Sequence, residues 1–119
     1  MKTNNIIVDK SKAFAIRIIN LYKYLCEEKH EYVLSKQLLR SGTSIGANVK
    51  EAVRGQSKDD FIHKMSISLK EASESEYWIE LLFETDYITE QQFNSIIDDC
   101  RELIKLLTSI IKTGRKEGK

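Results

Sequence analysis

Apolar side chains recur every three or four residues along most of this chain, which is the spacing of an amphipathic α-helix. In residues 9–29 they form two adjacent stripes that together make one wide apolar face. The stripes consist of Phe14, Ile18, Leu21 and Leu25, and of Ala15, Ile19, Tyr22 and Cys26. The polar run EEKHEY then breaks the pattern, so the sequence predicts a first helix over residues 9–29.

Two more helices are expected in the second half of the chain. Ser57 is a suitable N-cap, and two aspartates follow it in the turn where the helix dipole favours negative charge. This pattern predicts a helix over residues 57–84. Thr89 and Gln92 have the spacing of a capping box, and the most regular heptad pattern of the chain follows them. A last helix is therefore expected over residues 89–113, with Gly114 ending it.

The stretch between these segments is rich in glycine and serine and can be interpreted in two ways. Its apolar and small residues fall four and three positions apart, namely Leu38, Gly42, Ile45, Val49 and Ala52. A phosphate-binding loop would need a G-x-x-x-x-G-K-[ST] motif after a strand, and the sequence has neither. A helix over residues 35–54 is therefore favoured. In this helix Gly42 and Gly46 share one face, and their lack of side chains would let another helix approach closely.

Short connections near residues 30–34, 54–57 and 85–89 join these four segments. Helices linked in this way pack with antiparallel neighbours. No segment alternates as a strand does. We therefore expect an all-α, antiparallel up-down-up-down four-helix bundle that forms a single domain over residues 1–119.

The net charge of +1 hides an uneven distribution of charges. Residues 34–56 carry four basic and one acidic side chain, whereas residues 57–87 carry three basic and eight acidic ones. Any basic surface must therefore be local. No segment is apolar enough for a membrane span or a signal peptide, and Cys26 and Cys100 lie outside any C-x-x-C motif. We expect reduced thiols and a cytoplasmic location.

The two histidines could indicate either of two enzyme classes, a di-iron protein or a helical ribonuclease. A di-iron bundle needs carboxylates and two Glu-x-x-His motifs at one level. The nearest matches, Glu27-x-x-His30 and Asp60-x-x-His63, fall at opposite ends of the predicted bundle, roughly 30 Å apart by helix length. Small helical ribonucleases carry an arginine four to six residues before a histidine, and neither histidine here has one. We expect no catalytic residues, no metal and no cofactor.

Polar residues interrupt the apolar faces of the two middle helices. Glu71, Glu74 and Tyr77 recur at three-residue steps, and Arg40 and Asn48 stand on the preceding helix. One interpretation is a buried polar network that sets helix register. The other is an ordinary charged exterior, and the sequence leaves both open. The neighbouring Trp78 is more typical of a core or an interface than of a ligand platform.

The segments RSGTSIGANVKEA, residues 40–52, and SKDDFIHKMSISLKEASESEYWIELL, residues 57–82, resemble the bacterial "four helix bundle protein" family. Its founding members are encoded in intervening sequences of 23S ribosomal RNA genes. The resemblance implies a ring-like homopentamer and kinship with the accessory protein of diversity-generating retroelements, which binds nucleic acid beside a reverse transcriptase. The recurring family residues carry no catalytic assignment and are matched by Arg40, Ser44, Asn48, Glu51, Lys70, Glu71, Glu74, Tyr77 and Trp78.

The first functional hypothesis is a non-enzymatic, oligomeric module that binds RNA or DNA, with an adjacent-gene protein such as a reverse transcriptase as a further partner. Its candidate phosphate contacts are Arg40, Lys50, Arg54, Arg115 and Lys116. The alternative is a protein-interaction scaffold with no nucleic-acid role. In that hypothesis the acidic segment 57–87 would meet a basic partner.

Overall fold

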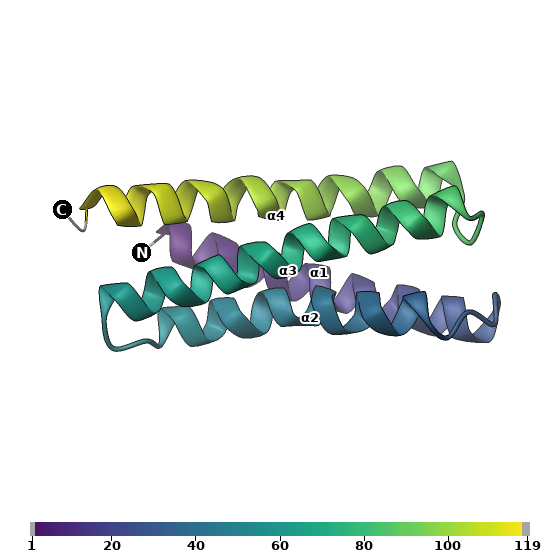
Figure 1. The fold of residues 1–119 in the computed structure, drawn as a ribbon, viewed down its shortest axis with the longest axis horizontal. Helices are drawn as coiled ribbons and strands as arrows, with labels where there is room; N and C mark the ends of the chain where they lie inside the picture. The colour runs from purple at the N-terminus through teal and green to yellow at the C-terminus, as the bar shows by residue number, and fades with distance from the viewer. Residues whose placement is uncertain (1, 118–119) are drawn as a thin grey trace.

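The structure is a computed structural model that describes the backbone of residues 2–117 and the side chains of residues 6–116. It contains four helices, α1 (Lys2–Glu27), α2 (Leu34–Val53), α3 (Lys58–Glu84) and α4 (Glu90–Glu117). Successive helices run in opposite directions along a rod of 49 × 21 × 20 Å (Figure 1). There is no strand between residues 2 and 117. The predicted all-α, up-down-up-down bundle is confirmed.

Two helix boundaries differ from the prediction by more than two residues. Helix α1 begins at Lys2 rather than at residue 9, because Ile7 is fully buried and extends the core stripe of Phe14 and Ile18 by another turn. Helix α4 continues through Gly114 to Glu117 instead of ending there. Gly114 is buried against Ile62 of α3, so tertiary packing keeps this turn helical despite the low helix propensity of glycine.

Each helix packs against two neighbours, in the order α1, α2, α3, α4 around the bundle axis. The tightest contact is between α2 and α3, and the sparsest is between α4 and α1, which closes the ring. Within the described residues, no Cα atoms of the diagonal helices, α1 with α3 and α2 with α4, lie within 8 Å of each other. One continuous apolar core fills the centre and includes Phe14, Leu38, Ile45, Met65, Ile79, Ile97, Leu103 and Leu107.

The glycine-rich segment is helical, as predicted, and its glycines face α1. A Cβ atom added to Gly42 would lie 2.8 Å from Cγ1 of Ile18. One added to Gly46 would lie 3.3 Å from the backbone oxygen of Ser11. Each helical glycine costs roughly 1 kcal/mol relative to alanine. Close packing of α1 and α2 offsets this cost.

The two predicted helix caps are confirmed, and the structure contains a third cap that the sequence did not predict. Ser57 Oγ accepts the backbone N–H of Asp60 at 3.0 Å. Thr89 and Gln92 form the reciprocal capping box, with N···O distances of 2.8 and 3.1 Å. The start of α2 is capped by the buried carboxylate of Glu31, which accepts three backbone N–H groups at 2.6–3.1 Å from residues 33–35.

Candidate functional site

The family-type polar residues meet on the outside of the contact between α2 and α3. Arg40 of α2 donates to the carboxylates of Glu71 and Glu74 on α3. Trp78 Nε1 donates to the same Glu74 carboxylate at 3.2 Å. Tyr77 packs its ring edge against Trp78 at a centroid distance of 5.3 Å. We call these five residues the α2–α3 polar cluster.

Beneath this cluster lies a buried row of serine hydroxyls. Ser75 Oγ donates to Ser41 Oγ at 2.8 Å, and Ser68 Oγ donates to the backbone oxygen of Ile45 at 2.8 Å. Both bonds join α3 to α2. These serines were not predicted from the sequence, although Ser68 and Ser75 stand seven positions apart within an apolar stripe of α3. The charged residues that the sequence singled out are partly exposed, so the interpretation of a buried network does not hold for them. The buried polar contacts between α2 and α3 are made instead by serines that neither interpretation named.

The remaining family-type residues make local contacts. Ser44 Oγ donates to the Arg40 backbone oxygen at 2.6 Å, and Asn48 Nδ2 donates to the Ser44 backbone oxygen at 2.9 Å. Glu51 forms an ion pair of 3.1 Å with Lys64. Lys70 lies exposed on α3. These contacts stabilise α2 and its junction with α3.

Four of the five candidate phosphate contacts gather at one end of the bundle. Lys50 and Arg54 end α2, and Arg115 and Lys116 end α4. Figure 1 shows the α2–α3 connection and the C-terminal end of α4 at the same end of the rod. All four side chains are exposed. We call them the basic end.

Arg40 lies apart from the basic end. It is 14 residues before Arg54 on the same helix, which corresponds to about 21 Å along the axis. Its guanidinium is also paired with Glu71 and Glu74. The structure therefore places Arg40 in the α2–α3 polar cluster rather than with the other basic candidates.

The histidines lie at opposite ends of the bundle, as expected. His30 stands in the α1–α2 connection, where its Nδ1 is 3.1 Å from the Tyr32 hydroxyl oxygen. His63 is exposed near the start of α3. Across the described residues no three His, Cys, Asp or Glu side chains are placed to hold a metal ion. A search of the same residues finds no helix with the length and apolarity needed to cross a membrane.

Both cysteines are free thiols. Cys100 is buried in the core and donates to the Ala72 backbone oxygen at 3.3 Å. Burial, together with the nearby Glu76 carboxylate, raises the pKa of the Cys100 thiol to about 12. Because the thiolate is the nucleophile, this thiol is unreactive near neutral pH.

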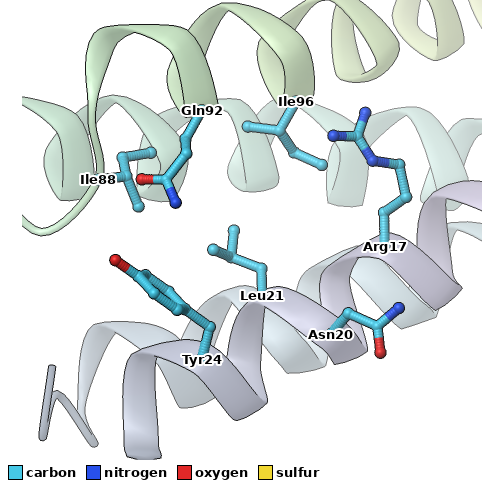
Figure 2. A pocket seen from close by; sticks show the side chains of 7 residues that line it. All are labelled: Arg17, Asn20, Leu21, Tyr24, Ile88, Gln92 and Ile96. Carbon is cyan, nitrogen blue, oxygen red and sulfur yellow. The ribbon is translucent and has the colours of Figure 1, made fainter. Parts of the chain in front are cut away.

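A surface hollow of about 290 Å³ lies between α1 and α4 (Figure 2). Leu21, Ile88 and Ile96 supply its apolar wall. Its polar residues are Arg17, Asn20, Tyr24 and Gln92. Arg17 reaches across the contact and pairs with Asp99 of α4 at 2.5 Å. The sequence did not predict this hollow, because its existence depends on the spacing between two helices that are distant in the chain.

Four antiparallel helices around one apolar core define a small helical-bundle protein. The model of the 23S rRNA-intervening sequence protein family matches residues 3–109. The chain therefore belongs to this family, which confirms the resemblance of its two middle helices.

A solved structure supports the same assignment. The chain is similar to a protein of unknown function from the S23 ribosomal protein family of Bacteroides thetaiotaomicron VPI-5482. The two are 59% identical, the match covers 92% of this chain and 98% of the other, and the TM-score is 0.91. No curated protein matches the chain.

Proposed function

We propose that this protein is a non-enzymatic, homo-oligomeric accessory factor that binds RNA or DNA through its basic end. The observation that carries the proposal is that four exposed basic side chains, two from α2 and two from α4, lie at the same end of the rod. None of the four forms an ion pair within residues 6–116. Their charges are therefore available to phosphate groups, whose neutralisation releases counterions and drives nucleic-acid binding.

The internal ion pairs weigh against the scaffold alternative. Arg40 pairs with Glu71 and Glu74, and Arg101 pairs with Glu76 and Glu80. Four of the eight acidic side chains in segment 57–87 thus share two guanidinium groups within the protomer, which offset about half of their charge. An acidic segment compensated in this way offers less charge to a basic partner protein.

Exposed apolar side chains support the oligomeric part of the proposal. Ile16 and Ile19 of α1 are 52% and 39% exposed, and Tyr77 of α3 is 54% exposed. Helices α1 and α3 are diagonal in the bundle, so the two patches lie on opposite sides of the protomer. Head-to-tail contact between unlike patches of neighbouring protomers forms a closed ring when the rotation between successive protomers closes. We propose that this ring has five protomers. Five copies of the basic end would then act together through avidity.

Titration of labelled single-stranded RNA and DNA with the protein tests the nucleic-acid part. We expect binding at about 50 mM salt and a steep loss of affinity by about 200 mM. The double variant Lys50→Glu, Arg54→Glu should lose this binding. The matched control, Lys23→Glu with Lys36→Glu, changes two exposed lysines at the other end of the rod and should retain it. Absence of binding by micromolar wild-type protein at the lower salt concentration would refute the proposal.

Sedimentation analysis tests the oligomeric part separately. We expect the wild-type mass to correspond to five subunits. Ile16→Glu places a charge in the exposed α1 patch and should release protomers that remain helical by circular dichroism. The control Lys12→Glu, also exposed on α1, should leave the assembly intact. A monomeric wild-type protein would exclude the ring.

A further inference from the structure

The end of the rod opposite the basic end carries an excess of negative charge. Figure 1 shows the α1–α2 and α3–α4 connections at this end. Five exposed carboxylates lie in or beside the two connections, namely Glu27, Glu28, Glu84, Asp86 and Glu90. None of them forms an ion pair within residues 6–116. Exposed lysines at the same end are fewer, namely Lys23, Lys29 and Lys36. We call this surface the acidic end.

Two neighbouring apolar side chains are exposed in the α1–α2 connection. Val33 is 71% exposed and Tyr32 is 58% exposed, more than any other large apolar side chain among the described residues. The backbone here is held in place by the buried carboxylate of Glu31, which accepts the N–H group of Val33 at 3.1 Å. A backbone that is already ordered loses less conformational entropy on binding. Tyr32 and Val33 are therefore suited to act as binding anchors, and we call them the apolar tip.

The basic end has a surface that complements the acidic end. A recess of about 560 Å³ lies beside the α2–α3 connection. Its lining residues are Glu51, Arg54, Gly55, Gln56, Asp60 and Lys64. Its volume is within the roughly 300–1,000 Å³ of small-ligand sites, so one aromatic ring can enter it. Val53, the last residue of α2, is 37% exposed and adds apolar surface at this end.

We propose that the acidic end of one protomer docks on the basic end of a second copy of this chain. Tyr32 of the first copy enters the α2–α3 recess of the second, and Val33 packs against Val53. The carboxylates of the acidic end then face Lys50 and Arg54. Nucleic acid requires the same two side chains, so each binding event excludes the other. The inference rests on the proposed function, because the end-to-end contact regulates the nucleic-acid site.

The size of the end surfaces predicts how this contact assembles. The rod has a cross-section of 21 × 20 Å, about half of the ~800 Å² that a standard interface buries on each partner. A single pair of protomers therefore associates weakly. In the proposed ring, rotation places all basic ends on the same side, so two stacked rings make five such contacts together. The contact is head-to-tail and does not close, so the rings stack into open columns.

Other occupants fit the acidic end less well. Nucleic acid and anionic lipid surfaces are repelled by its excess negative charge. A second copy offers unpaired cations, exposed apolar surface and a recess together at one end. A different basic protein matches the charge alone. It also leaves the purified protein without columns, which the following experiments detect.

Sedimentation of the full chain at about 50 and about 300 mM salt tests the contact, because screening weakens attraction between exposed charges. At the lower salt concentration we expect columns, with a mass that rises with protein concentration. At the higher one we expect single rings. The double variant Tyr32→Ser, Val33→Ser should form single rings in both conditions. The control Gln37→Ser, exposed at the same end, should behave as the wild type does.

Charge reversal identifies the two surfaces that meet. Lys50→Glu with Arg54→Glu places carboxylates at the basic end, and Glu27→Lys with Glu84→Lys places lysines at the acidic end. The latter positions are the last residues of α1 and α3, where the helix dipole favours positive charge. Neither double variant should form columns alone. An equal mixture should form them, because the new lysines of one variant meet the new glutamates of the other.

Labelled single-stranded RNA separates this contact from the proposed function. RNA should reduce wild-type columns to single rings. Where half of the basic ends are covered, the apparent Kd of the wild type should be about twofold higher than that of Tyr32→Ser, Val33→Ser. Columns formed by a protein that binds no RNA would refute the proposed function and confirm the end-to-end contact.

Three results would overturn the proposal. The first is a wild-type mass at about 50 mM salt no greater than that at about 300 mM. The acidic end would then belong to a different protein. The second is column formation by the Tyr32→Ser, Val33→Ser variant, or none in the mixture of charge-reversed variants. The third is RNA that binds to the columns without lowering their mass.

Discussion

Gly42 of α2 lies directly against Ile18 of α1, so closely that a Cβ atom at position 42 would be 2.8 Å from Ile18 Cγ1. Ile18 is fully buried, so its side chain has no free space into which it can move. Two effects compete when this glycine is replaced by alanine. The helix gains roughly 1 kcal/mol of propensity, whereas overpacking of a filled core costs about 1–3 kcal/mol.

Gly42→Ala should therefore lower the free energy of unfolding by about 1 kcal/mol, because the overpacking term is the larger one. Urea unfolding followed by circular dichroism measures the change. The control Ser73→Ala, at an exposed position of α3, should leave stability unchanged or slightly raised. A more stable Gly42→Ala protein would mean that α1 and α2 can move apart without loss.

The hydroxyls of Ser41 and Ser75 should be coupled in energy. They are buried and hydrogen-bonded to each other at 2.8 Å. Ser75→Ala or Ser41→Ala alone removes one partner, and each should cost about 1–2 kcal/mol of stability. The double alanine variant should cost less than the sum, because in each single variant the remaining hydroxyl keeps only its backbone acceptor, Leu38 O for Ser41 or Glu71 O for Ser75. A double-mutant cycle in urea measures this coupling, and strict additivity would contradict it.

Glu31 should make stability depend on pH. Burial acts to raise the pKa of its carboxyl, but the backbone N–H groups of residues 33–35 outweigh this effect and hold the pKa below the ordinary value of 4.5. The unfolded chain therefore takes up this proton at a higher pH than the folded chain does. The stabilising contribution is complete above about pH 4.5 and is lost as the pH falls through the folded pKa.

Glu31→Gln should lower stability at neutral pH by about 1 kcal/mol, the usual size of a lost N-terminal cap. It should also flatten the decline in stability below about pH 4.5. Urea titrations at several pH values compare the variant with Glu28→Gln, a substitution at an exposed position of the same connection. Equal pH slopes for wild type and Glu31→Gln would show that the carboxylate does not cap α2.

Cys100 should resist alkylation in the folded protein. Its thiol is buried, with a pKa raised to about 12, so almost no thiolate is present at pH 8. Cys26 is only partly buried and should react first. Mass spectrometry after treatment with iodoacetamide distinguishes the two sites, and urea should make both reactive. Labelling of Cys100 as fast as Cys26 in native buffer would place it outside the core.

Local sequence signals predicted the helices well where the physical cause is itself local. The capping box of Thr89 and Gln92 lies within one turn, and it is formed in the structure. The apolar spacing of residues 38–52 correctly indicated a helix despite its glycines. The predicted start of α1 and the predicted end of α4 were wrong. Burial of Ile7 and Gly114 against other helices extends both helices beyond their local signals.

The candidate surfaces were only partly predictable. The family-type residues Arg40, Glu71 and Glu74 were recognised from the sequence, but their ion pairs require α2 and α3 at a particular register. The Ser41–Ser75 hydrogen bond and the hollow between α1 and α4 were not anticipated. Each depends on atoms from helices that are remote from one another in the chain.

The sequence by itself determined four amphipathic helices, their antiparallel order and the positions of their small residues, because periodicity and capping act over a few residues. Only the tertiary structure decided which charges remain unpaired and where neighbouring helices leave hollows. Those outcomes depend on rotation and spacing between helices. Core packing sets both through side chains that the linear pattern does not bring together.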